Sequence, residues 1–175
     1  MNRRAFTKYI ASGAFVGLAG GYYWLNTLRD HSQLSVDLML DKLDVLSKTP
    51  LETMGQWDAP RTFHHLAQSV EFSMAGFPEQ KSAMFQNTVG QLAYKVFRAR
   101  GTMSHGLDEA IPGEVIIDNG ETPQAIDRLK TALLDFRSYD ADLKPHFAYG
   151  HLSKTDYAIA HALHINNHLE EFQLA

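Results

Sequence analysis

The segment from Ser153 to Phe172 decides the fold and reads SKTDYAIAHALHINNHLEEF. Five aromatic and imidazole side chains recur in it at intervals of four, three, four and four residues, namely Tyr157, His161, His164, His168 and Phe172. Residues with this spacing share one face of an α-helix. Ile165 and Leu169 flank that face, so the pattern predicts a C-terminal helix whose histidines point into a protein interior.

Imidazole groups in a protein interior are costly unless they have partners. Neutral imidazole is a common ligand of divalent ions, and His164 and His168, four residues apart, can hold one ion together. A third ligand can come from His65 in an earlier helix, whereas His64 lies about 100° around that helix. The alternative is that these histidines bind backbone carbonyls or carboxylates and hold no metal.

Four further helices are predicted by periodicity, capping residues and prolines. The first begins near Asp30 or Ser32 and ends before Pro50. The second begins at Asp58, with a proline in its first turn, and ends near Met74. For the C-terminal helix itself, Ser153 followed three residues later by Asp156 predicts the N-terminal cap.

The two middle helices are predicted from apolar stripes. One begins near Ser82, and its stripe consists of Phe85, Val89, Leu92 and Val96. The other begins at Thr122, and its inward residues are Ile126, Leu129, Leu133 and Phe136. Residues 101–121 are rich in glycine and look irregular, with one short extended piece at 115–117. Five helical segments and almost no strand pattern predict an all-α fold, most economically a four-helix bundle with one additional helix or crossover.

The composition limits the classes of function. The chain has 175 residues, of which 45% are hydrophobic, and a net charge of −4. These values fit one globular domain and exclude a disordered chain. The acidic balance argues against nucleic-acid binding, which needs a basic face. The absence of cysteine excludes disulfides and thiolate ligands, so a transition-metal site must use nitrogen and oxygen ligands.

The first 29 residues differ from the rest of the chain. They contain four basic side chains and no acidic one, and residues 9–26 are uncharged. The order Arg-Arg-x-Phe-x-Lys from Arg3 to Lys8 resembles the twin-arginine signal, which directs folded proteins across the bacterial inner membrane. A general secretory signal or an N-terminal membrane anchor is the alternative. We therefore expect a signal or anchor at 1–29 and a helical domain at 30–175, located in the periplasm or anchored to the inner membrane facing it.

The stretch His164-Ile165-Asn166-Asn167-His168, together with His65, resembles the DinB/YfiT-like metalloenzymes, which are four-helix bundles with a three-histidine divalent metal site. The likeness covers residues 32–175, with specific matches at 65–78, 146–153 and 164–172, and is greatest to a branch of unknown function that often carries export signals. It implies that His65, His164 and His168 bind the metal. The chain departs from the family pattern at Asn167, where a histidine is usual, and at Phe147, where a proline is usual.

Three imidazole ligands leave an open position at which a bound water or a substrate thiol can lose a proton. Glu71 is a candidate base, Gln68 a candidate substrate or water contact, and His161 and His146 candidate proton-transfer groups. Histidines in loops and caps are more often surface residues, and these are His31, His105, His146 and His151. The resemblance implies a thiol-dependent transferase or isomerase, and the residues also permit metal-assisted hydrolysis.

Zinc is the expected metal, with nickel or iron as alternatives. The expected partners are a small-molecule substrate, with a low-molecular-weight thiol and a second copy of the chain as further candidates. Contact with a membrane is expected only through the N-terminal segment. The competing hypothesis is a non-catalytic periplasmic binding or interaction module whose metal is structural or absent. A fourth protein ligand, such as His161, would favour that hypothesis, whereas an exchangeable water would favour catalysis.

Overall fold

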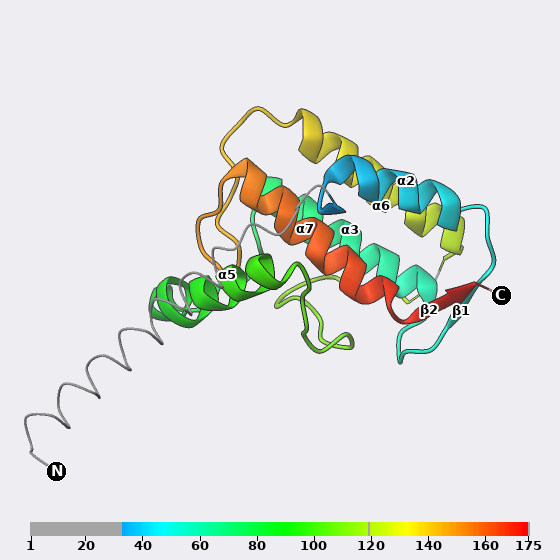
Figure 1. The fold of residues 1–175 in the computed structure, drawn as a ribbon, viewed down its shortest axis with the longest axis horizontal. Helices are drawn as coiled ribbons and strands as arrows, with labels where there is room; N and C mark the ends of the chain where they lie inside the picture. Colours follow the sequence, from blue (N-terminus) through cyan, green and yellow to red (C-terminus); the bar gives the residue numbers. More distant parts are fainter. Residues whose placement is uncertain (1–32, 119, 175) are drawn as a thin grey trace, which may run out of the picture.

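A computed structural model describes residues 33–118 and 120–174 of the chain (Figure 1). The described part is mostly helical, as expected for an all-α protein. Its elements, in chain order, are α2 (Val36–Leu46), β1 (Leu51–Thr53), α3 (Ala59–Ala75), α4 (Ala83–Phe85), the π-helical segment η2 (Gln86–Gly90), α5 (Gln91–Arg100), α6 (Thr122–Ser138), α7 (Lys154–Leu169) and β2 (Phe172–Leu174). The predicted export segment at 1–29 lies outside the described residues. No described helix combines the length and the apolar character needed to cross a membrane.

Most helix boundaries follow the capping residues. The Asp58 carboxylate accepts a hydrogen bond from the Arg61 amide at 3.0 Å, at the start of α3. Ser153 caps α7, where the Asp156 amide donates to the serine hydroxyl at 3.1 Å. The predicted start of the first helix is wrong, because Ser35 caps α2 through the Leu38 amide.

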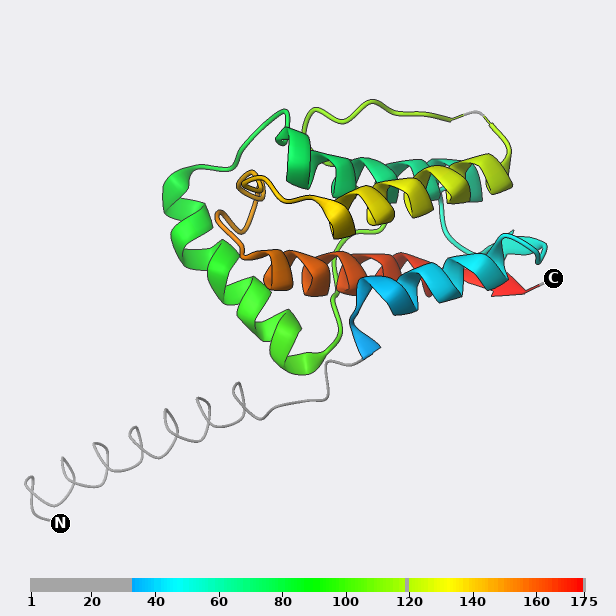
Figure 2. The same ribbon diagram turned by 90° about the horizontal axis from the view of Figure 1, so that it is seen from above.

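Four helices, α2, α3, α6 and α7, share one hydrophobic core. Figure 2 shows α3 beside α6 and α2 beside α7, with α5 crossing one end of the group. The predicted stripe of α6 is confirmed, because all four of its apolar residues are buried. The core therefore holds α3 and α7, which carry most of the candidate site, against each other.

The predicted apolar stripe of Phe85, Val89, Leu92 and Val96 spans α4, η2 and α5, and it is largely exposed rather than buried, so that prediction is wrong. Val89 and Leu92 are exposed, and the helix packs instead through Gln86, Gly90 and Tyr94. The Gln86 amide donates to the Phe147 carbonyl at 3.1 Å, and the Tyr94 hydroxyl donates to Asp156 at 2.8 Å. These polar contacts and the close approach at Gly90 select the packed face, so apolar periodicity alone identifies the wrong one.

Two short strands form the only sheet in the described residues, and the sequence did not predict it. β1 and β2 pair antiparallel, with Leu51 opposite Leu174 and Thr53 opposite Phe172. Each strand has three residues, too few to show alternation. The extended piece expected at 115–117 forms no strand, although the Gln68 side chain holds the backbone of Val115.

Candidate metal centre

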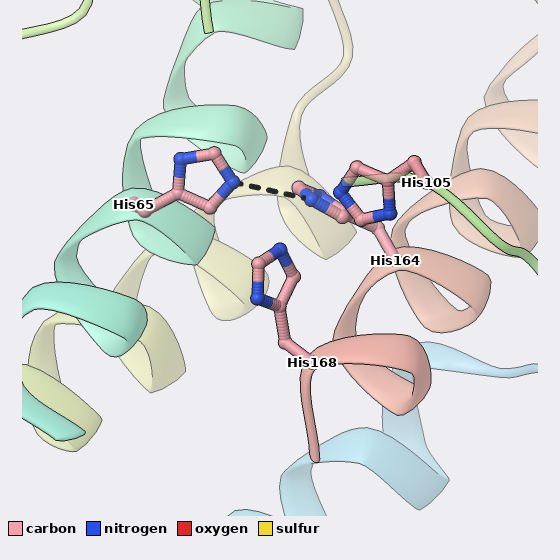
Figure 3. A group of neighbouring side chains, drawn as sticks. All are labelled: His65, His105, His164 and His168. Atoms are coloured by element: carbon pink, nitrogen blue, oxygen red, sulfur yellow. Dashed lines mark hydrogen bonds between the residues drawn. The ribbon is translucent and has the colours of Figure 1, made fainter. Parts of the chain in front are cut away.

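Four histidines converge between α3, α7 and the long loop that joins α5 to α6 (Figure 3). His65 lies on α3, and His164 and His168 lie one turn apart on α7. His105 reaches the group from the loop. One ring nitrogen from each residue lies within 4.8 Å of the corresponding nitrogens of the others. The structure therefore brings the three predicted ligands together and adds a fourth histidine.

Three of these rings are fixed by a hydrogen bond at Nδ1. His65 Nδ1 lies 2.7 Å from Glu114 Oε2, His105 Nδ1 lies 2.8 Å from Asn167 Oδ1, and His164 Nδ1 lies 3.2 Å from Ser69 Oγ. A carboxylate accepts hydrogen bonds and does not donate them, so Nδ1 of His65 carries the proton and its Nε2 keeps a lone pair. This arrangement is the one that orients histidine ligands in metal proteins.

The Nε2 atoms of two of these rings face each other. His65 Nε2 lies 3.3 Å from His164 Nε2 (Figure 3). Because His65 already uses its Nδ1 proton on Glu114, a single His65–His164 hydrogen bond is the most that the two Nε2 atoms can form. The ring nitrogens of the cluster that form neither this contact nor a hydrogen bond at Nδ1 therefore need a different partner.

His168 has no such partner. Its side chain is completely buried, and neither Nδ1 nor Nε2 has a hydrogen-bond partner among the described residues. Its ring stacks on Trp57 at a centroid distance of 6.3 Å, which fixes the ring without satisfying its nitrogens. An unsatisfied buried polar group costs about 1–3 kcal/mol. The donor set therefore fits a bound cation, which would give the unprotonated nitrogen of this ring a partner.

The surroundings favour the neutral form of three of these imidazoles, those of His105, His164 and His168. Burial, followed by the nearby histidines, holds the pKa of His164 well below its usual value and lowers the pKa of His168 to about 2. Burial also lowers the pKa of His105, the most exposed member of the group. Neutral imidazole is the form that binds metal ions, so these three rings are ready to bind at neutral pH.

A pocket of about 350 Å³ opens beside the cluster, and His65, His105 and His164 contribute to its wall. The other walls are largely apolar and include Phe85, Met103, Ile111, Phe147 and Tyr149. Lys81 and Glu109 are the charged lining residues. A small, mostly apolar molecule in this pocket would lie against the imidazole rings.

His146 and His161, predicted as proton-transfer groups, line the same pocket. His146 is buried rather than exposed, so its expected surface position is wrong. Its Nδ1 accepts hydrogen bonds from the amides of Ala148 and Tyr149 at 3.1 and 3.2 Å. The proton of the neutral ring therefore lies on Nε2, which is a donor. Burial lowers the pKa of His146 to about 3.

His161 is held by aromatic packing. Its ring stacks on Tyr157 at a centroid distance of 5.4 Å and meets Phe136 edge-on at 5.0 Å. Its Nε2 is buried without a hydrogen-bond partner in the described structure, and burial lowers the pKa of the ring to about 3. His161 is not one of the four clustered residues. The fourth histidine of the cluster is His105, whereas the sequence suggested His161 as a fourth ligand.

Gln68 and Glu71 make other contacts. The Gln68 side chain donates to the Val115 carbonyl at 2.9 Å and accepts from its amide at 3.0 Å, which anchors the long loop to α3. Glu71 accepts two hydrogen bonds from Arg128, at 2.9 and 2.7 Å. Neither residue lines the pocket. The expected water contact and base are therefore engaged elsewhere in this conformation.

Sequence reasoning missed His105, Glu114 and the role of Asn167. The first two lie in an irregular loop, where no periodicity relates them to the helices. Asn167 was noted only as a departure from the family pattern, yet it accepts the hydrogen bond that orients His105. The density of histidines in the domain was the one signal that could have suggested a fourth member.

The comparisons with known proteins bear on the whole domain. Residues 26–174 match the family model described as a protein of unknown function, DUF1569. The chain belongs to the DUF1569 family. A comparison with curated proteins and one with solved structures each found no match. The DUF1569 match covers all four clustered histidines and the pocket beside them.

Proposed function

We propose that this DUF1569 protein binds a divalent metal ion through His65, His164 and His168, with His105 as a fourth, loop-borne ligand. The observation that carries the proposal is His168, a fully buried ring with two unsatisfied nitrogens, one of which lies among the ring nitrogens of three other histidines. Without a metal, neither nitrogen of that ring has a hydrogen-bond partner among the described residues, and an unsatisfied buried polar group costs about 1–3 kcal/mol.

Zinc is the proposed metal, with nickel and iron as alternatives. All candidate ligands are imidazoles, which suit each of these ions, and the chain has no cysteine to favour a softer ion. Glu114 would strengthen the site, since a carboxylate behind a histidine makes its Nε2 a better ligand.

The metal would support catalysis on a small molecule in the neighbouring pocket. A bound divalent ion supplies Lewis acidity, which lowers the pKa of a water or thiol that reaches it. The apolar walls would exclude bulk water, and His146 would donate a hydrogen bond from Nε2 to an oxygen of the substrate. His161 would act as a second polar contact from α7. Hydrolysis and thiol-dependent transfer both fit this arrangement.

The second candidate function is a binding module with a structural metal, and His105 is the observation that favours it. Four protein ligands around a tetrahedral ion leave no open position. His105, however, is borne by a loop and is more exposed than the helical ligands, so its release would open one position. Catalysis requires that His105→Ala still binds metal, whereas a closed structural site would lose the ion with this change.

Metal content tests the central proposal. The protein should be purified from its native host and analysed by mass spectrometry beside His65→Ala, His164→Ala and His168→Ala. We expect about one equivalent of a transition metal in the unaltered protein and a large loss in each variant. His151→Ala, at an exposed loop histidine, is the matched control and should keep its metal. Less than about one tenth of an equivalent in the unaltered protein would refute the metal site.

The proposal extends to fold type and location. The shared core of α2, α3, α6 and α7 supports a DinB-like four-helix bundle, and the Arg3-Arg4 pair supports export to the periplasm. Replacing both arginines by lysine should retain the protein in the cytoplasm, as measured by cell fractionation. Unchanged export of this variant would exclude the twin-arginine route.

A further inference from the structure

A second feature of the molecule, separate from the histidine cluster, is the segment 80–100, here called the basic arm. It contains α4, η2 and α5, which lie across one end of the four packed helices (Figure 2). The basic arm has four basic side chains, Lys81, Lys95, Arg98 and Arg100, and no acidic one. The other residues from 30 to 175 carry eight basic and twenty acidic side chains, so the charge of the arm is opposite to that of its domain.

The basic arm also exposes a row of large apolar side chains. Met84, Val89 and Leu92 are 79%, 57% and 60% exposed, and Phe85 is exposed beside them. Val89 and Leu92 are three residues apart, so their side chains lie on one side of the helix. The opposite side, with Gln86, Gly90 and Tyr94, is the one that packs on the domain. The apolar row is therefore not needed for packing the domain.

Basic residues border this row. Lys95 is exposed and lies three residues after Leu92, on the same side of the helix. Arg98 contributes less charge, because it forms an ion pair with Asp156 at 2.7 Å. A helix with exposed Phe, Leu, Val and Met beside lysine and arginine has the chemistry of a segment that lies in the interface of an anionic membrane.

We infer that the exposed face of the basic arm docks on a bilayer surface that contains anionic phospholipid. Charge complementarity selects this occupant. Two copies of the chain that met symmetrically through this face would bring the same basic side chains together. Residues 1–29 have four basic side chains and no acidic one, so they offer no complementary charge to the basic residues of the arm. Anionic headgroups satisfy the basic residues while the acyl boundary accepts the apolar row.

Docking through the basic arm would also place the pocket near the membrane. Lys81 and Phe85 belong to the basic arm and also line the pocket beside the cluster. Docking of this face would bring the rim of that pocket to the membrane surface. A molecule partitioned into the lipid interface would then reach the pocket without crossing bulk water.

The absence of native cysteine allows a position-specific test on the full chain. An environment-sensitive fluorophore is attached to Met84→Cys in the basic arm or to Met54→Cys, a control site near β1 that is 65% exposed. Vesicles of phosphatidylglycerol should shift the emission to the blue at position 84 and leave position 54 unchanged. Vesicles of phosphatidylcholine alone should shift neither.

A matched pair of double variants gives the affinity. The double variant Val89→Asp, Leu92→Asp adds two negative charges to the basic arm. The control variant Val45→Asp, Leu134→Asp adds the same two charges outside the arm, at residues that are 60% and 42% exposed. The first pair should weaken the position-84 response to phosphatidylglycerol vesicles about tenfold or more, and the second by less than about threefold. Equal losses, or equal blue shifts at positions 84 and 54, would overturn the inference. A position-84 shift that appears without vesicles and grows with protein concentration would assign the face to a second copy and overturn it too.

Discussion

Glu114 and His65 form a buried pair in which the imidazole donates to the carboxylate at 2.7 Å, although 49 residues of sequence separate them. Both side chains are almost completely buried. Glu114 Oε2 also accepts from the Ile111 amide at 3.1 Å, so the carboxylate is fixed before it orients the ring. The long loop therefore contributes to the cluster twice, through His105 and through Glu114.

Replacing Glu114 by Gln should lower metal affinity about 10–100-fold, because the neutral amide is a weaker acceptor for His65 Nδ1–H and can present a donor instead. The measurement is a competition titration with a chelator of known affinity. Asp118→Asn is the control, since this exposed acid of the same loop pairs with Arg61 and should leave affinity unchanged. Equal affinity in the Glu114 variant would show that the carboxylate does not support a metal ligand.

Asn167 and His105 should behave as one unit. If Asn167 matters because it orients His105, Asn167→Ala and His105→Ala should change metal affinity by similar amounts. The double variant should then lose little more than either single variant, with a coupling energy of about 0.5–3 kcal/mol. Additive losses would assign the two residues separate roles. Chelator competition on the four proteins of this cycle gives the result directly.

The sequence predicted the elements whose information is local. The caps at Asp58 and Ser153, the buried stripe of α6 and the histidine face of α7 each depend on residues within one helix. Pairing His65 with the α7 histidines was also successful, because two inward helical faces in a small domain have few neighbours to choose from.

The features that were missed depend on contacts distant in sequence. His105 and Glu114 lie in a loop whose path is set by the Gln68–Val115 hydrogen bonds to α3, and no spacing rule encodes such a path. The apolar row of the basic arm was interpreted as core because periodicity identifies an amphipathic helix without saying what its apolar face contacts. Exposed apolar residues and core residues have the same pattern until the packed neighbours are known.

The histidines predict a pH-dependent stability for the metal-free protein. Burial lowers the pKa of His146 and of His161 to about 3, from 6.5. Below pH 6.5 the unfolded chain takes up these protons while the folded chain does not, so stability falls as the pH falls. Each residue should contribute a loss of about 2 kcal/mol between neutral pH and pH 5. Urea unfolding with a chelator present, followed from pH 7.5 to 5, measures this slope.

Single replacements separate the contributions to that slope. His161→Gln removes one of the suppressed protonations, so the dependence on pH should weaken by about one proton even if the variant is less stable at every pH. His151→Gln, at an exposed loop position, should leave the slope unchanged. A slope that does not respond to His161→Gln would mean that this ring is already accessible to protons in the folded state.

Gly90 tests how the basic arm is joined to the pocket. A Cβ at this position would overlap the backbone carbonyl oxygen of Ala148. That overlap can be relieved only if η2 or the 146–150 turn shifts. Gly90→Ala should therefore destabilise the protein by about 1–3 kcal/mol in urea unfolding. Gly55→Ala is the control, since its Cβ would meet the flexible end of the Glu171 side chain.

Because His146 lies in the displaced turn and η2 in the arm, Gly90→Ala should also weaken ligand binding in the pocket, while metal content stays near that of the unaltered protein. Loss of the metal together with stability would instead show that the arm and the histidine cluster form one cooperative unit.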